Sequence, residues 1–198
     1  MRKRSYYLVN GITTYRLLSA PVLIVLIFAD KIELFKWLLA IGFATDMIDG
    51  YLARKFKVIS RFGARLDSIA DDFTIIAAIV GVFVLKMDFI KEQMVPVGIM
   101  LVLFLFENVM ALVKYRKPSS FHTYLAKVAA VFQGFFLILI FFLPQPLYGL
   151  FFAAFVITAL DLIEEIILVF LLPKWETNVK GLYWVLKQKK GRGKPSNG

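Results

Sequence analysis

The chain has 198 residues, 60% of them hydrophobic, with a mean hydropathy of +0.73 and a net charge of +10. Soluble domains are typically about 45–50% apolar, so this composition excludes a soluble globular protein and predicts one compact membrane bundle. Since there is no cysteine and only one histidine, disulfides, thiolate metal sites and multi-histidine zinc sites are also excluded. The basic excess of a membrane protein indicates anionic lipid headgroups as partners and no nucleic acid.

Six apolar segments follow one another, each close to the ~20 residues that cross a hydrocarbon core of ~30 Å. They cover residues 8–29, 33–54, 64–86, 94–114, 122–143 and 148–172. Their length and their lack of period-two alternation exclude strands. We therefore expect an all-α integral membrane protein, a six-transmembrane-helix bundle forming one domain over residues 1–175, with a basic cytoplasmic tail over residues 176–198.

Basic residues gather at alternate ends of these segments. They precede the first segment, separate the second from the third and the fourth from the fifth, and follow the sixth. The positive-inside rule then predicts that both termini are cytoplasmic. We expect a multi-pass protein of the inner cell membrane, in which the junction between the second and third segments faces the cytoplasm.

That junction is unusually rich in carboxylates. Asp46 and Asp49 are three residues apart, and Asp67 and Asp71 are four apart, so each pair shares one helix face. A short linker would fold the two helices into a hairpin that brings both pairs to a similar depth. Each carboxylate would cost about 2.5–3.5 kcal/mol at the centre of a membrane helix, so counter-charge is required.

A divalent metal best supplies that charge, because Arg54 and Arg65 contribute only two positive charges. Ligands that are all oxygen select Mg²⁺ or Mn²⁺ over zinc, and two such ions on shared carboxylates form a clamp for phosphoryl transfer. Gly50 and Gly63 leave room where a ligand approaches, and the planar fork of Arg54 suits a phosphate. The alternative is a polar network between helices that binds no ligand.

These residues match a known signature. The pattern is Asp46-x-x-Asp49-Gly50-x-x-Ala53-Arg54, eight residues, then Gly63-x-x-x-Asp67-x-x-x-Asp71. It resembles the signature of the CDP-alcohol phosphotransferases at every motif position, and the six-span layout agrees with that family's fold. The resemblance implies transfer of a phosphatidyl group from CDP-diacylglycerol to a small polar alcohol, release of CMP, and a homodimer.

The resemblance also implies a role for each motif residue. Asp46, Asp49 and Asp67 would bind a pair of Mg²⁺ or Mn²⁺ ions, while Asp71 would touch metal and act as general base on the acceptor hydroxyl. The residues that would hold CDP are Asp49, Gly50, Ala53, Arg54, Ser60 and Gly63. Asp72 lies outside the signature and is expected to bond a neighbouring helix or a basic side chain.

Two weaker motifs concern the acceptor. Asn10-x-x-Thr13-x-x-Arg16 is similar to the start of family members that make phosphatidylglycerophosphate, and its three residues share one helix face. They either line the nucleotide or acceptor pocket, or Arg16 snorkels or pairs with the acidic cluster. Lys127 and Gln133 remain from a G-K-x-K-T-x-x-Q pattern of glycerophosphate-using members, in which alanines replace the glycine, the second lysine and the threonine.

From these partial matches we expect glycerol 3-phosphate as the acceptor, with Lys127 on its phosphate. Inositol phosphate, inositol and serine are the alternative acceptors. The alternative role for Lys127 is a structural one, in an ion pair with Glu107. Asp161, Glu164 and Glu165 are expected to pair inside the bundle or to form a dimer contact. The alternatives are pairing with Lys127 or Arg116, or recognition of the charge of the acceptor.

Two functions outside the family compete with this one. A Mg²⁺-dependent membrane prenyltransferase is disfavoured by the Asp-Gly-x-x-Ala-Arg continuation, and a carboxylate-lined ion carrier by the apolar outer halves of the second and third segments.

Overall fold

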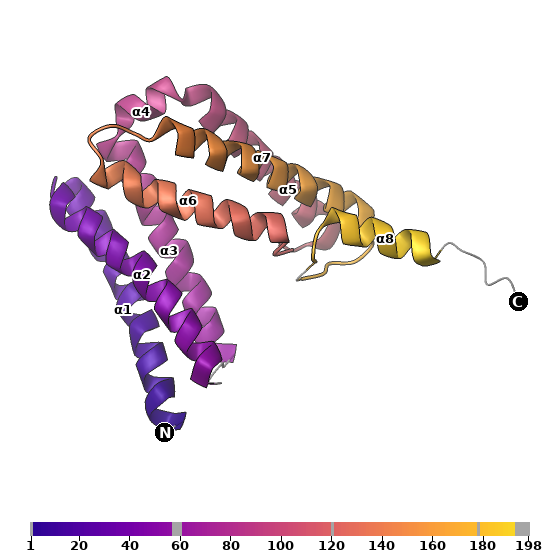
Figure 1. Cartoon of the computed structure of the whole chain (residues 1–198), viewed down its shortest axis with the longest axis horizontal. Coiled ribbons are helices and arrows are strands. Elements are labelled where there is room, and N and C mark those ends of the chain that lie inside the picture. The colour runs from indigo at the N-terminus through magenta and orange to yellow at the C-terminus, as the bar shows by residue number, and fades with distance from the viewer. Residues whose placement is uncertain (1, 57–60, 120, 178, 193–198) are drawn as a thin grey trace, which may run out of the picture. The chain divides into compact units, whose positions relative to one another are not determined.

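The structure is a computed structural model that describes residues 2–56, 61–119, 121–177 and 179–192. Within these residues it is helical, with no strand (Figure 1). The helices are α1 (Arg2–Phe28), α2 (Ile32–Phe56), α3 (Arg61–Leu85), α4 (Met87–Glu92), α5 (Met94–Tyr115), α6 (Tyr124–Phe142), α7 (Tyr148–Leu171) and α8 (Leu182–Arg192). The predicted all-α class is therefore confirmed.

The six long helices fall on the six predicted segments, and the short helices α4 and α8 were not predicted. Among the residues that the structure describes, three stretches are long and apolar enough to cross a membrane: Gly11–Phe28, Met94–Tyr115 and Tyr124–Phe142. The other long helices, α2, α3 and α7, carry the acidic residues discussed below. The chain is a multi-pass membrane protein, and the count of six spans stays a prediction.

The chain forms two compact units. One comprises residues 1–92 and 137–146, and the other comprises residues 93–136 and 147–198. The boundaries between them fall between α4 and α5, inside α6 and just before α7. The predicted end of the membrane domain at residue 175 remains a prediction.

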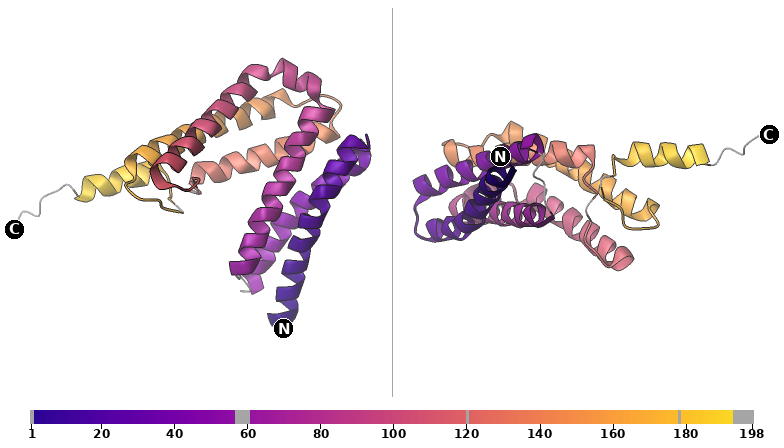
Figure 2. Two further views of the ribbon diagram at one scale, coloured as in Figure 1. Left: turned by 180° about the vertical axis from the view of Figure 1, so that it is seen from behind. Right: turned by 90° about the horizontal axis from the view of Figure 1, so that it is seen from below.

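In the first unit, α1 packs along both α2 and α3, whereas α2 and α3 meet each other over a shorter stretch (Figure 2). Gly81 of α3 allows close approach, because a Cβ there would lie 2.6 Å from Cζ of Phe35 on α2. The Phe35 ring in turn meets the Phe141 ring edge to face, with centroids 4.9 Å apart. These contacts pack α2 against α3 and against the end of α6, and the packing of α2 and α3 along α1 positions the site.

In the second unit, α5 and α7 lie side by side (Figures 1 and 2). Their ends pack around a buried apolar cluster formed by Ala111, Phe121, Leu168, Val169, Leu172, Val179 and Val185. Lys114 Nζ donates to the Val169 carbonyl at 2.8 Å, and the Tyr115 hydroxyl lies 2.8 Å from the Leu172 carbonyl. These side chains satisfy backbone acceptors that the end of α7 leaves without helical partners.

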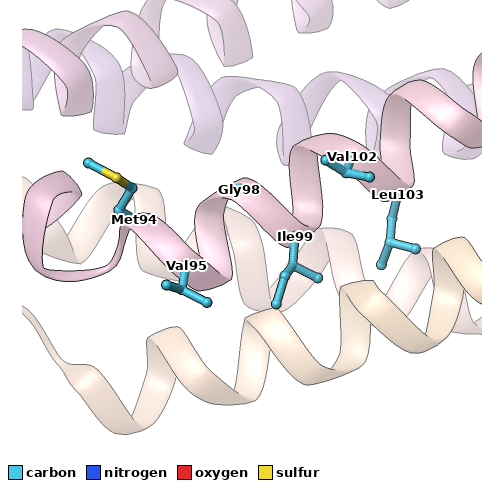
Figure 3. Close-up of a pocket in the computed structure, with 6 residues that line it drawn as sticks. All are labelled: Met94, Val95, Gly98, Ile99, Val102 and Leu103. Atoms are coloured by element: carbon cyan, nitrogen blue, oxygen red, sulfur yellow. The ribbon is translucent and has the colours of Figure 1, made fainter.

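A pocket of about 450 Å³ lies along α5 in this unit (Figure 3). Its lining residues are Met94, Val95, Gly98, Ile99, Val102 and Leu103. Val95 and Val102 are 72% and 66% exposed, which suits a surface that faces lipid. Because no lining side chain is polar, this pocket offers no group for catalysis.

Candidate active site

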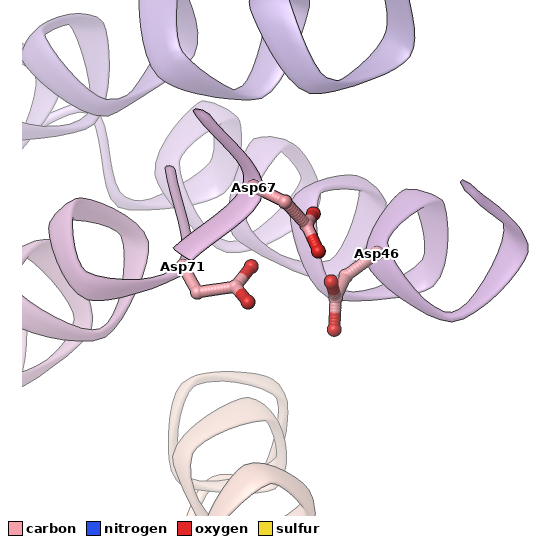
Figure 4. A group of neighbouring side chains, drawn as sticks. All are labelled: Asp46, Asp67 and Asp71. Atoms are coloured by element: carbon pink, nitrogen blue, oxygen red, sulfur yellow. The ribbon is translucent and has the colours of Figure 1, made fainter. Parts of the chain in front are cut away.

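Three of the four signature aspartates converge in the first unit. Asp46 comes from α2, and Asp67 and Asp71 come from successive turns of α3 (Figure 4). One carboxylate oxygen from each lies within 4.8 Å of the other two. The i, i+4 spacing on α3 and the packing of both helices on α1 produce this convergence, as the predicted hairpin required.

Arg16 of α1 joins all three carboxylates. Its Nη1 lies 2.9 Å from Oδ1 of Asp46 and 3.1 Å from Oδ1 of Asp67, and its Nη2 pairs with Oδ1 of Asp71. The Arg16 side chain is buried, with 1% of the residue exposed, whereas the aspartate side chains are 36–39% exposed. Of the open interpretations of Arg16, pairing with the acidic cluster is therefore confirmed; binding of acceptor by Arg16 stays a prediction.

The charge balance of this group favours a cation. Three carboxylates face one guanidinium, which leaves net negative charge at a partly exposed site. Among the residues described, these aspartates form the one set of three metal-ligating side chains that is close enough to share an ion. All the donors are carboxylate oxygens, the ligands of hard cations, so the residues fit Mg²⁺ or Mn²⁺.

The other residues predicted to hold CDP lie on or beside the same two helices. Four of them, Asp49, Gly50, Ala53 and Arg54, belong to the last turns of α2, with side chains outside the described residues. Gly63 lies half-buried in the first turn of α3, and Ser60 is outside the described residues. Their roles toward CDP stay predictions.

The N-terminal acceptor motif lies on α1. Thr13 is one turn before Arg16 and is 2% exposed, so both face the interior. Asn10 is one turn earlier, and its side chain lies outside the described residues. Ser19 donates to the Arg16 carbonyl at 2.8 Å, which adds a further polar contact along this face. The motif therefore contributes Arg16 directly to the aspartate cluster.

Lys127 and Gln133 lie on α6 in the second unit. The Lys127 ammonium is exposed and stands 5.3 Å from the centre of the Tyr124 ring. No carboxylate of the described chain lies within ion-pair distance of Lys127, so the alternative pairing with Glu107 is wrong. Gln133 Nε2 donates to the Thr158 hydroxyl at 2.7 Å, which ties α6 to α7. Binding of acceptor by these two residues stays a prediction.

The acidic residues of α7 are held by uncharged donors of the same unit. Asp161 accepts a hydrogen bond of 3.2 Å from the Thr123 hydroxyl. Glu164 accepts one of 2.7 Å from the Leu182 backbone N–H. Glu165 accepts one of 2.8 Å from the Ser119 hydroxyl. These bonds connect α7 to the segment before α6 and to the start of α8. Pairing inside the bundle is confirmed, whereas an ion pair with Lys127 is wrong.

Comparison with known proteins agrees with this site. The sequence profile of the CDP-alcohol phosphatidyltransferase family matches residues 6–171 and so includes every element that supplies the site. The chain belongs to the CDP-alcohol phosphatidyltransferase family. No solved structure matches the chain.

Several curated relatives carry a more specific name. CDP-diacylglycerol–glycerol-3-phosphate 3-phosphatidyltransferase of Cereibacter sphaeroides is 43% identical over 77 residues, 36% of this chain and 34% of that protein. The protein of the same name from Rickettsia felis is 33% identical over 133 residues, 64% of this chain and 70% of that protein. A fusion protein of Schizosaccharomyces pombe, named as cardiolipin synthase (CMP-forming) and mitochondrial hydrolase, is 38% identical over 71 residues, 36% of this chain and 12% of that protein. The chain thus spans about a third of the length of the Cereibacter relative.

Proposed function

We propose that this protein transfers a phosphatidyl group from CDP-diacylglycerol to glycerol 3-phosphate and releases CMP. The observation that carries the proposal is the convergence of Asp46, Asp67 and Asp71 to within 4.8 Å on the two helices that bear the family signature. Family membership supports the reaction type. The names of the bacterial relatives support glycerol 3-phosphate as the acceptor.

Each signature residue then has a task in one displacement. Asp71 accepts the proton of the acceptor hydroxyl as its oxygen forms a bond to the β-phosphorus of CDP-diacylglycerol. The bond from that phosphorus to the oxygen of CMP breaks, and CMP leaves with the bonding electron pair. Asp46, Asp49, Asp67 and Asp71 would hold two Mg²⁺ or Mn²⁺ ions, which supply Lewis-acid stabilisation of the phosphate charge. Gly50, Ala53, Arg54, Ser60 and Gly63 bind the CDP moiety.

The acceptor side rests on weaker support. Asn10, Thr13 and Arg16 on α1, and Lys127 and Gln133 on α6, are the proposed acceptor-binding residues. Lys127 suits a phosphate, because it is exposed and its ammonium stands over the Tyr124 ring, 5.3 Å from the ring centre. The alanines around it remove a lysine and a hydroxyl of the glycerophosphate pattern, so inositol phosphate, inositol and serine are the alternative acceptors.

The reaction needs a membrane protein with a site open to water on one side. We propose six spans with both termini in the cytoplasm and the aspartates facing the cytoplasm of the inner membrane, in accord with the distribution of basic residues. We further propose a homodimer. Partial exposure of the three aspartate side chains, 36–39%, suits a site that exchanges soluble acceptor and CMP with water.

The experiment is CMP release by the purified full chain in detergent micelles. Labelled CDP-diacylglycerol and Mg²⁺ or Mn²⁺ are supplied with glycerol 3-phosphate, inositol 1-phosphate, myo-inositol or serine as the acceptor. We expect CMP release that requires glycerol 3-phosphate and is lost in Asp71→Asn but kept in Asp72→Asn, its exposed neighbour. Release with another acceptor only would reassign the substrate, and no release with any acceptor would refute the proposal.

A further inference from the structure

We infer that Arg16 is a built-in counter-cation of the aspartate cluster, one that holds the three carboxylates together and competes with divalent ions for them. The inference rests on the proposed function, which assigns metal ions to those carboxylates. It adds a role for a side chain of α1, outside the signature on α2 and α3.

The first support is geometric. The guanidinium binds one oxygen of each of the same three aspartates that are close enough to share an ion, with Nη1 between Asp46 and Asp67 and Nη2 on Asp71. A divalent ion within this group would stand only a few ångströms from the guanidinium. Like charges at that separation repel strongly in a partly buried site. Binding of the metal and the present position of the guanidinium are therefore mutually unfavourable.

The second support is burial. Arg16 is 1% exposed, and α1 packs against both α2 and α3. A buried guanidinium depends on its counter-charges, and removing one side of such a set leaves the other uncompensated. Without metal, loss of Arg16 leaves three carboxylates facing one another. The arginine thus cross-links three helices, α1, α2 and α3.

The third support is the proposed chemistry of Asp71. In the present arrangement Nη2 of Arg16 engages Oδ1 of Asp71, so this oxygen is not open to an acceptor hydroxyl. Displacement of Arg16 when metal binds would leave an Asp71 oxygen available to the acceptor hydroxyl. The planar guanidinium of Arg16 would then be available to a phosphate of either substrate.

This role predicts opposite changes in two properties of an Arg16 variant, its stability without metal and its affinity for divalent ions. Removing the charge of Arg16 lowers the stability of the metal-free protein, yet tightens divalent-ion binding. A purely structural arginine would support both properties, so its loss would weaken both. An arginine that only binds acceptor would leave the metal affinity unchanged.

The test uses the full chain in detergent with Arg16→Gln, Arg16→Lys and a control, Lys91→Gln. Lys91 is a cation of the same unit whose side chain is 66% exposed and whose ammonium lies 3.8 Å from Asp88. Free Mn²⁺ is titrated by electron paramagnetic resonance, and metal-free and Mn²⁺-bound melting temperatures are measured by circular dichroism. Neither readout depends on turnover.

We expect Arg16→Gln to bind Mn²⁺ about tenfold or more tightly than wild type, the scale of one unit charge removed from a partly buried site. Its metal-free melting temperature should fall, and Mn²⁺ should raise it by more than in wild type. Arg16→Lys keeps the positive charge but loses the planar guanidinium, so its Mn²⁺ affinity and melting temperature should lie between those of Arg16→Gln and wild type. Lys91→Gln should match wild type.

Equal or weaker Mn²⁺ binding in Arg16→Gln overturns the inference. If that variant does not fold, Arg16→Lys decides: tighter Mn²⁺ binding than in wild type supports the competition, and unchanged or weaker binding refutes it. Wild-type CMP release separates this outcome from failure of the proposed function. Acceptor-dependent release with unaltered Mn²⁺ affinity in the variants refutes the competition alone, whereas absence of release refutes the transferase.

Discussion

Nη1 of Arg16 lies 2.9 Å from Oδ1 of Asp46, and this contact joins α1 to α2 across thirty positions of sequence. The same nitrogen lies 3.1 Å from Oδ1 of Asp67, so α3 is joined at the same point. One side chain of α1 therefore holds together two aspartates that lie on different helices, α2 and α3. The family signature supplies the carboxylates, and α1 supplies the group that gathers them.

Replacing Asp46 or Asp67 by asparagine should remove a metal ligand without changing side-chain volume. We expect Mn²⁺ binding to weaken and CMP release to fall by about 10²–10³-fold, the scale of losing one group that stabilises a transition state. Mn²⁺ titration and the CMP assay measure the two effects. Asp72→Asn is the matched control, since Asp72 is exposed on the same helix as Asp67. A variant at Asp46 or Asp67 with wild-type values would exclude that residue as a ligand.

Removal of divalent ions tests the same site without a substitution. Excess EDTA should abolish CMP release, because no other described set of three metal-ligating side chains lies close enough to hold an ion. Added Mg²⁺ or Mn²⁺ should restore it, while Ca²⁺ should restore less, since it prefers more ligands at longer distances. Activity that persists in EDTA would contradict the metal requirement.

The sequence predicted the helices well because long, mostly apolar segments without period-two alternation form helices. All six predicted segments match long helices, and the spacing of Asp67 and Asp71 correctly placed both on one face. The partner of those aspartates could not be chosen from spacing, because Arg16 is distant in sequence and its contacts depend on how α1 packs. Lys127 likewise was open to pairing with Glu107, and only packing in the second unit excluded it.

Lys127→Gln tests the acceptor side. If the ammonium binds the phosphate of glycerol 3-phosphate, the KM for that acceptor should rise about tenfold, in line with loss of a hydrogen bond to a charged group. The KM for CDP-diacylglycerol should not change. Steady-state CMP release at varied concentrations of each substrate measures both. Lys180→Gln, an exposed lysine of the same unit, is the control. An unchanged acceptor KM would remove Lys127 from the binding site.

Gly81→Ala should destabilise the first unit. The added Cβ would lie 2.6 Å from Cζ of Phe35 and 3.1 Å from Cζ of Phe141, and the Phe35 ring is fully buried. Overpacking of this kind costs about 1–3 kcal/mol. Thermal unfolding in detergent should show a lower melting temperature. Gly134→Ala on α6 is the control, because nothing lies within 4 Å of its Cβ, and that variant should be neutral or slightly stabilised.

Glu164→Ala should release the start of α8. Glu164 Oε1 accepts a hydrogen bond of 2.7 Å from the Leu182 backbone N–H, at the first residue of that helix. Gly181 precedes it with a φ of 141°, a left-handed conformation that favours glycine and lets the chain turn beside Glu164.

Loss of such a cap costs about 0.5–2 kcal/mol, so amide exchange at Leu182 should accelerate by about two- to thirtyfold, with CMP release unaffected. Hydrogen–deuterium exchange by mass spectrometry measures this. Glu176→Ala, which removes an exposed carboxylate before α8, should leave that exchange unchanged. Equal protection of Leu182 in Glu164→Ala and wild type would mean that the apolar cluster around Val185 holds α8 by itself.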